Sequence, residues 1–284
     1  MAAAGPCKFC VHYDPGSMGA KHFRIDDPGS FDLDEIDPGD TAGGPSSKDE
    51  AREAAEGMHE RLADLQELLF AEHQHKVLII LQGMDTSGKD GTVRHVLRGV
   101  SPAGVKVVSF KKPASNELDH DYLWRIHAHV PGKGEIGIFN RSHYEDVLVV
   151  RVHDLVPADE WKLRYDQIND FERMLAETGT TILKFFLHIS KKEQRERLQA
   201  RLDDPTKHWK FEHGDLEERK LWDDYQKAYQ DAIRKTSTKW APWYVIPADR
   251  KWFRDYVIAD IIIKTLEKLD MKYPQPDVSK ERVE

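Results

Sequence analysis

Short apolar runs alternate along this chain with longer segments whose apolar residues recur at helical spacing. The runs predict five strands, at residues 77–82, 105–110, 136–139, 181–187 and 243–246. The segments with helical spacing predict helices at residues 92–99, 118–129, 159–177, 191–201, 216–235 and 252–269. This alternation is typical of an α/β fold in which helices cover both faces of a parallel sheet, and such sheets bind ligands at the carboxyl ends of their strands.

A further helix is predicted before the first strand. Ser47 and Glu50 form a capping-box pattern, and a stripe of leucines follows at helical spacing. The residues before Ser47 are rich in Asp-Pro-Gly turns, which indicate an extended segment. The chain therefore divides into an extended, partly flexible arm (1–46), one α/β domain (47–273) and a C-terminal tail (274–284).

Composition narrows the setting in which the protein works. No run approaches the roughly 20 apolar residues that span a bilayer, and the first residues lack the basic and apolar regions of a signal peptide. We therefore expect a cytoplasmic protein without a membrane partner. Cys7 and Cys10 form a C-x-x-C pair beside His12. The pair could serve thiol redox chemistry or, with a further ligand, a metal, but its Gly/Pro-rich surroundings favour a plain tail.

The net charge of −8 is unevenly distributed along the chain. Residues 26–60 hold twelve acids and two bases, which leaves a net charge of +2 on the rest. Between Lys89 and Lys112, six Lys or Arg residues stand against the single acid Asp90. Such an excess suits a polyanionic partner, although it is also common on an ordinary solvated face.

The first chemical motif follows the first predicted strand. It reads G-x-x-x-x-G-K and precedes a predicted helix, which is the context that a P-loop requires. In such a loop the backbone N–H groups curl around a phosphate, and Lys89 reaches the phosphate as a mobile point charge. The alternative is a tight glycine turn, but strand, spacing and lysine together favour phosphate binding. The residues expected to contact phosphate or nucleotide are Gly83, Thr86, Ser87, Gly88, Lys89, Asp90, Gly91 and Thr92.

Two acids accompany this loop. Asp90 stands where a P-loop usually has a magnesium-binding Ser or Thr, and Asp85 lies inside the loop. Carboxylates at these positions would repel a phosphate chain unless a cation or basic side chains neutralise them. We therefore expect Asp85 to bind Mg²⁺ or to orient the attacking group, in preference to a plain turn aspartate.

The second motif follows the third predicted strand. Asn140 occupies the position at which an Asp usually supports the magnesium shell, so charge compensation falls more on Asp85 and Glu145. These three residues are the predicted metal ligands. Arg141 is placed to bind a phosphate bidentately. We interpret His143 as a hydrogen-bonded surface histidine, with a catalytic base as the alternative.

Basic residues also follow the second and fourth predicted strands. Arg197 and Arg201 are four residues apart on a predicted helix, so they share a face, and a Pro-interrupted segment follows. Residues 191–215 therefore predict a lid that closes over phosphates, with a charged surface helix as the alternative. Lys111 and Lys112 extend the basic surface on the side where the ligand is expected.

With these motifs together, the chain resembles the polyphosphate kinase 2 family over residues 23–273. The resemblance rests on four segments in a fixed order, at residues 83–91, 139–148, 197–211 and 243–249. It implies a P-loop kinase fold like that of thymidylate kinase: a three-layer sandwich with a five-stranded parallel sheet and a helical lid. The Asn-Arg-Ser-x-Tyr-Glu form of the second segment looks like the branch that accepts both AMP and ADP.

The resemblance also implies an activity, which is transfer of phosphate between inorganic polyphosphate and nucleotides with Mg²⁺. The catalytic residues would be Asp85, Lys89 and Arg141, moving a terminal phosphoryl group in line without a covalent intermediate. The other basic residues would bind phosphate oxygens or the polyphosphate chain: Arg197, Arg201, Lys111 and Lys112. Expected partners are polyphosphate, adenine or guanine nucleotides and further copies of the chain, and not nucleic acid.

Two other functions stay open at this point. An ATP-dependent nucleotide monophosphate kinase shares the fold and the loop, but it would need ATP and ignore polyphosphate. A regulatory protein on a P-loop fold would bind phosphate without turnover. The acids and arginines around the loop argue against the second alternative.

Overall fold

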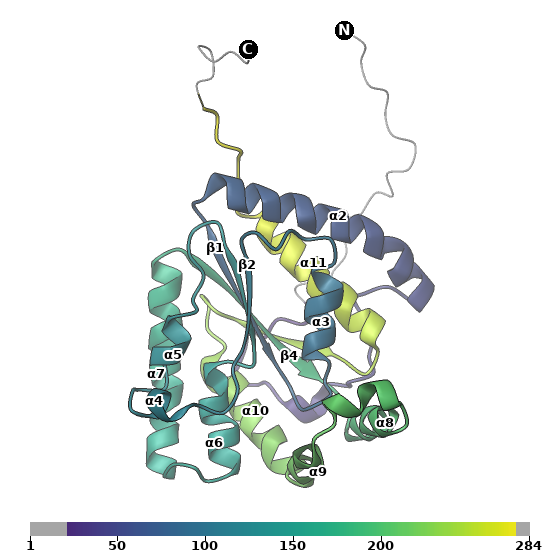
Figure 1. The fold of residues 1–284 in the computed structure, drawn as a ribbon, viewed down its shortest axis with the longest axis vertical. Coiled ribbons are helices and arrows are strands. Elements are labelled where there is room, and N and C mark those ends of the chain that lie inside the picture. The colour runs from purple at the N-terminus through teal and green to yellow at the C-terminus, as the bar shows by residue number, and fades with distance from the viewer. Residues whose placement is uncertain (1–21, 277–284) are drawn as a thin grey trace.

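A five-stranded, all-parallel sheet in the order β2-β3-β1-β4-β5 forms the centre of the molecule (Figure 1). The computed structural model describes residues 22–276, and the Cys7–Cys10 pair lies outside this range. The strands are β1 (Lys76–Gln82), β2 (Val105–Ser109), β3 (Ile136–Asn140), β4 (Thr180–His188) and β5 (Trp243–Pro247). Each strand coincides with a predicted apolar run, so the predicted parallel sheet is confirmed.

The central strand β1 fixes where a ligand can bind. All its residues after Lys76 are buried, because strands flank it on both edges and helices cover both faces. β3 lies on one side of β1 and β4 on the other, so the sheet order reverses at β1. Open α/β sheets bind ligands in the crevice at such a reversal. The P-loop begins directly after Gln82 and therefore lies at this point.

Helices form a layer on each face of the sheet (Figure 1). One layer contains α2 (Lys48–Glu72), α3 (Lys89–Val96) and α11 (Lys251–Glu267). The other contains α7 (Ala158–Glu177) and α10 (Trp222–Thr236). The predicted three-layer sandwich is thus confirmed. Within the described range no helix is both long and apolar enough to cross a membrane.

The prediction of a single helix at residues 118–129 is wrong in extent. This part of the chain forms two short helices, α4 (Ser115–Leu118) and α5 (Trp124–His127). Between them the Asp121 carboxylate accepts a hydrogen bond from the Leu123 N–H (3.0 Å) and closes a turn. An Asp that bonds its own local backbone in this way competes with helix formation.

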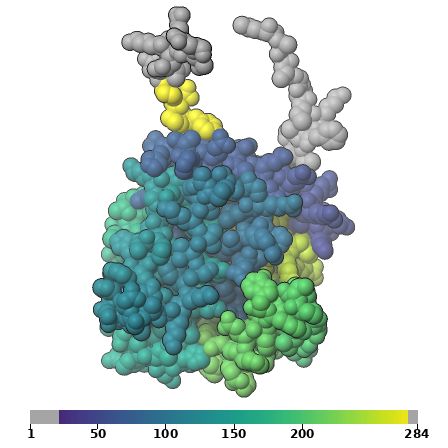
Figure 2. Space-filling view, in the orientation of Figure 1, coloured from purple at the N-terminus to yellow at the C-terminus, as the bar shows by residue number. Residues whose placement is uncertain are grey.

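The prediction of a single helix at residues 216–235 is also wrong in extent. The chain is divided there at Leu221, whose backbone (φ −89°, ψ 17°) leaves helical geometry between α9 (His213–Lys220) and α10. α9 therefore belongs to a separate lobe with α8 (Lys191–Leu202) and the 3₁₀ turn η3 (Pro205–Lys210). Figure 2 shows this lobe, in green, standing against the body of the molecule.

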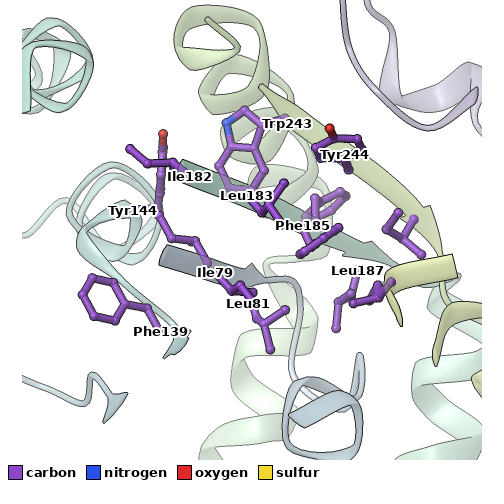
Figure 3. Close-up of a cluster of buried hydrophobic side chains, with 14 of the residues drawn as sticks. Ile79, Leu81, Phe139, Tyr144, Ile182, Leu183, Phe185, Leu187, Trp243 and Tyr244 are labelled. Carbon is purple, nitrogen blue, oxygen red and sulfur yellow. The ribbon is translucent and has the colours of Figure 1, made fainter. Parts of the chain in front are cut away.

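A buried polar network lies inside the core among the apolar side chains that Figure 3 shows around Tyr144. Lys184 of β4 donates to Glu172 (2.6 Å) and to the Tyr144 hydroxyl (2.8 Å). His143 lies 3.2 Å from the same Glu172 carboxylate. All four side chains are fully buried, so each charge depends on its partner. The interpretation of His143 as a surface residue is therefore wrong, because the turn η2 (His143–Val147) folds it inward onto Glu172.

The described part of the arm packs against the last strand. Its Phe23 and Ile25 exchange backbone hydrogen bonds of 2.9 Å with Val245 and Trp243, which covers the outer edge of β5. Farther along the arm, Leu33 is buried in the core. The arm is therefore integrated into the sheet edge and the core.

Candidate active site

The loop between β1 and α3 has the geometry of a phosphate cradle. Gly83 (φ 151°) and Gly88 (φ 105°) have backbone angles that favour glycine, and a Cβ at Gly88 would collide with Arg254. Thr86 adopts a left-handed conformation (φ 65°). Helix α3 begins at Lys89, immediately after the loop, so its partial positive charge points at the same space.

The Lys89 side chain is folded back along its own loop. Its ammonium donates to the carbonyl oxygens of Gly83 (2.6 Å) and Met84 (3.3 Å). Burial lowers the pKa of Lys89 to about 8, Arg141 acts in the same direction, and nearby carboxylates partly offset both. A phosphate beside this ammonium would stabilise its charged form and give it a stronger partner than a carbonyl.

Two hydroxyl groups of the loop are buried without a partner. The side-chain oxygens of Thr86 and Ser87 have no hydrogen-bond partner within the described part of the chain. Buried polar atoms in folded proteins are usually satisfied, and exceptions call for a ligand, an ion or water. These hydroxyls are therefore fitted to accept such a group at the loop.

A cavity of about 220 Å³ opens beside the loop. Asp85 of the loop and Arg141, which directly follows β3, both line it and form an ion pair of 2.7 Å. Glu145 of η2 lines the same cavity, and burial raises the pKa of its carboxyl group although Arg141 and Lys89 oppose the shift. Burial works against the Arg141 charge, but Glu145 and Asp85 outweigh it and raise the Arg141 pKa. The structure thus brings Asp85 of the first motif together with Arg141 and Glu145 of the second.

The far wall of the cavity comes from residues that the sequence did not single out. α9 and the residue before it supply acids, and α10 supplies two aromatic rings; the residues are Glu212, Asp215, Glu218, Tyr225 and Tyr229. Burial and the neighbouring Asp85 both raise the pKa of Asp215. The cavity lining is therefore acidic and contains one arginine, Arg141.

Asn140 and Asp90 face each other across the start of α3. The Asn140 amide donates a hydrogen bond to the Asp90 carboxylate and so stabilises its negative charge. Asn140 is buried at the end of β3, whereas Asp90 is exposed. The Thr92 hydroxyl, two residues farther along α3, donates to the Asp255 carboxylate (3.4 Å).

The two predicted phosphate-binding arginines of α8 have different surroundings. Arg197 is buried, and its guanidinium donates to the carbonyl oxygens of Thr86 (2.9 Å) and Ser87 (3.0 Å). It also contacts the carbonyls after β5 and the Glu193 carboxylate, so all its donors have acceptors. In this arrangement Arg197 braces the back of the loop, whereas Arg201 pairs with Asp215 (3.2 Å) and ties α8 to α9.

Lys111 and Lys112 lie outside the cavity. They follow β2, the strand farthest from β4 and β5, and both are exposed. Among the described residues, neither belongs to the lining of the cavity. They therefore form a basic edge outside the cavity, although Phe110, the residue before them, donates to the Asn140 carbonyl next to Arg141 (3.3 Å).

Comparison with known proteins shows the family and supports the fold. A profile of the family Polyphosphate kinase 2 (PPK2) matches residues 45–274, which is most of the chain. The chain belongs to the polyphosphate kinase 2 family. The resemblance found in the sequence is confirmed, and the protein is an enzyme of the phosphotransferase class that characterises the polyphosphate kinase 2 family.

Members of the polyphosphate kinase 2 family match nearly the whole chain. An AMP/ADP-polyphosphate phosphotransferase from Meiothermus ruber is 59% identical over 263 residues, which cover 93% of this chain and 98% of that protein. An ADP-polyphosphate phosphotransferase from Rhodopseudomonas palustris is 45% identical over 271 residues, covering 90% and 92%. The crystal structure of Polyphosphate Kinase 2 from Arthrobacter aurescens TC1 aligns with a TM-score of 0.88 at 46% identity, covering 91% of this chain and 92% of that one.

Phosphotransferases of this kind work with a divalent cation. The site has oxygen ligands that could bind such a cation together with the phosphates of a substrate. Between residues 22 and 276 no three His, Cys, Asp or Glu side chains gather into a metal cage. Mg²⁺, however, usually takes only one or two carboxylates and completes its shell with water and substrate phosphates. Asp85 and Glu145 line the cavity, and the unpartnered hydroxyls of the loop lie in the same P-loop as Asp85. The Asn140 amide is directed at Asp90.

Proposed function

We propose that the protein transfers the terminal phosphoryl group of inorganic polyphosphate to ADP and to AMP. The observation that carries this proposal is the ion pair of Asp85 with Arg141, which lies where the P-loop meets the cavity. The P-loop, which would bind the phosphoryl donor, therefore lies directly beside the cavity, which would bind the acceptor. The activity in the name of the 59%-identical relative supports both nucleotides as acceptors.

The donor end of polyphosphate would lie on the P-loop. The loop amides and the N-terminus of α3 favour phosphate oxygens, and the Lys89 ammonium needs only to leave two carbonyls to reach them. As negative charge shifts toward the bridging oxygen of the leaving polyphosphate, Lys89 stabilises it. Catalysis is then positioning plus charge stabilisation, because phosphoryl transfer asks for little covalent chemistry from the protein.

The acceptor nucleotide would occupy the cavity. Its acidic wall repels a polyanion, but a neutral base and ribose can approach those carboxylates as hydrogen-bond donors. Tyr225 and Tyr229 offer aromatic surface to a base. The phosphate of the nucleotide would meet Arg141, which places the attacking oxygen next to the P-loop.

Mg²⁺ is the cation that we propose for this site. Asp85 and Glu145 would hold it together with phosphate oxygens, while the Asn140–Asp90 pair lies at the adjacent end of α3. When bound, the ion would compensate the charge of the donor and acceptor phosphates. Asp85 would keep its second role, which is to orient Arg141 through their ion pair.

The decisive experiment supplies the protein with polyphosphate, Mg²⁺ and either AMP or ADP, without ATP, and follows ATP by luminescence. We expect ATP from both nucleotides, and none when polyphosphate is omitted or when Lys89 is changed to Ala. ATP from ADP alone would contradict the proposed use of AMP. No ATP from either, with ATP-dependent phosphorylation of a monophosphate by the same preparation, would replace polyphosphate kinase with an ordinary nucleotide kinase.

A further inference from the structure

Side chains from other elements hold the carbonyl side of the P-loop. Arg197 of α8 donates to the carbonyls of Thr86 and Ser87, and Arg254 of α11 donates to that of Ser87 (3.0 Å). Lys89 holds the first two carbonyls of the loop. Between these, the carbonyl of Asp85 accepts a hydrogen bond from the Gln194 side chain (3.2 Å).

These hydrogen bonds matter for phosphate binding because of peptide geometry. Each peptide unit is planar, with its C=O and N–H pointing in opposite directions. A donor that holds a carbonyl on the outside of the loop therefore keeps the N–H of the next residue directed inward. Gln194 controls in this way the peptide that joins Asp85 to Thr86, and so the backbone beside the catalytic carboxylate.

Gln194 is itself held by α9. Its side chain is fully buried, and its amide oxygen accepts from the Arg219 guanidinium (2.8 Å). The same guanidinium nitrogen donates to the Lys191 carbonyl in the first turn of α8 (2.7 Å). A continuous path of hydrogen bonds therefore runs from Arg219 on α9, through Gln194, to the backbone of Asp85.

The far end of this path lies at the cavity. α9 carries Asp215 and Glu218, which form part of the cavity wall, one turn and one residue respectively before Arg219. Glu218 is fastened to the neighbouring elements by Tyr225 and His153. A change in the seating of α9 therefore reaches Gln194 through Arg219, and the P-loop through Gln194.

We infer that Gln194 is a positioning residue for phosphoryl transfer, which with Arg219 couples the seating of the α9 wall to the P-loop backbone at Asp85. The inference rests on the proposed function, in which the cavity takes the acceptor and the loop takes the donor. Gln194 touches neither substrate. Its effect is on the alignment of the loop with whatever binds against α9.

The test compares Gln194→Met and Arg219→Met with the double variant. Methionine keeps much of the length and volume of glutamine but can neither donate to Asp85 nor accept well from Arg219. Gln199→Met is the matched control, because Gln199 lies on the same helix, is exposed, and bonds only its neighbour Asp203 among the interactions described. Each protein is assayed for kcat and for KM of polyphosphate and nucleotide, with its melting temperature measured in parallel.

We expect kcat to fall about tenfold in each single variant, since small misplacements at a phosphoryl-transfer site are costly. The KM of polyphosphate should change little, because the loop amides and Lys89 remain. The kcat of the double variant should be no lower than that of either single variant. If the two residues act through one path of hydrogen bonds, either single substitution already breaks that path. Gln199→Met should match the unaltered protein.

A second measurement does not depend on activity. In hydrogen–deuterium exchange, the peptide covering residues 83–92 should exchange about tenfold faster in both single variants, since its outer hydrogen bonds are weakened. Unchanged loop exchange and unchanged kcat would overturn the inference, and so would effects that multiply in the double variant. If the unaltered protein made no ATP from polyphosphate, the proposed function would fail, while loop exchange would still decide whether Arg219 and Gln194 act as one path.

Discussion

Lys89 has one set of partners in the structure described here and would have another during catalysis. Its ammonium now holds the carbonyls of Gly83 and Met84, and the P-loop geometry directs it toward a phosphate. Removal of this donor leaves the loop amides in place but takes away the mobile charge. We expect Lys89→Ala to lower kcat/KM by about 100-fold or more, as for loss of a donor aimed at developing negative charge.

Polyphosphate-dependent ATP formation measures this loss. The melting temperature serves as the control, because a variant that merely unfolds would lose both activity and the thermal transition. Lys89→Ala with full activity would remove the lysine from the mechanism.

The lowered pKa of Lys89 predicts a pH dependence. Burial brings that pKa to about 8, so the side chain is charged below this pH and loses its proton above it. Since only the ammonium binds phosphate, kcat/KM should fall about tenfold for each pH unit well above 8. The profile of kcat/KM reports the free enzyme, and the residual activity of Lys89→Ala should lack this decline. A flat profile of the unaltered enzyme to pH 10 would contradict the prediction.

The P-loop, Asp85, Arg141 and Glu145 could be found from the sequence because each directly follows or lies near the end of a strand. Other residues of the site could not. Gln194 and Arg254 act on the loop from elements that follow it by more than a hundred residues, and no local pattern links them to it. The acids of α9 resemble any charged helix surface until the structure places them at a cavity.

At the scale of elements, the structure shows that α8 supports the P-loop through Arg197. Arg197 can clamp substrate phosphate only by leaving the five acceptors that it now has. We expect Arg197→Met to destabilise the fold by about 3 kcal/mol, because buried carbonyls behind the P-loop would lose their donors. Arg195→Met, on the exposed face of the same helix, should change stability by less than about 0.5 kcal/mol.

Urea denaturation of the two variants distinguishes the possible roles of Arg197. A large loss of unfolding free energy identifies a brace of the loop. Unchanged stability combined with a raised KM for polyphosphate would instead identify a direct contact to substrate.

The strands were predictable and two of the helices were not, for a physical reason. Strands of a parallel sheet are enclosed on both faces, so they appear as continuous apolar runs. The helical spacing at residues 216–235 continues across Leu221, where the direction of the chain changes. That change is set by contacts of α9 with distant elements, such as Asp215 with Arg201, which periodicity does not contain.

At the scale of the whole molecule, the arm contributes to the core from the far end of the sequence. Leu33 is 1% exposed although it lies in a segment rich in turn residues. We expect Leu33→Ala to lower the free energy of unfolding by about 2–4 kcal/mol, the usual cost of emptying a buried leucine site. Leu155→Ala is the control, since that leucine is 62% exposed. Chemical denaturation measures both, and equal stability of the two variants would show that the arm contributes nothing to the fold.

The pairing of the arm with β5 also imposes an order on the synthesis of the protein. Phe23 and Ile25 leave the ribosome long before their backbone partners Val245 and Trp243. Arg254, which holds the Ser87 carbonyl, follows later still. A nascent chain that has already produced every residue of the P-loop therefore lacks part of the support of that loop. Completion of the phosphate site must therefore await the synthesis of α11, so the support of the P-loop is assembled only after residues far beyond the loop have been made.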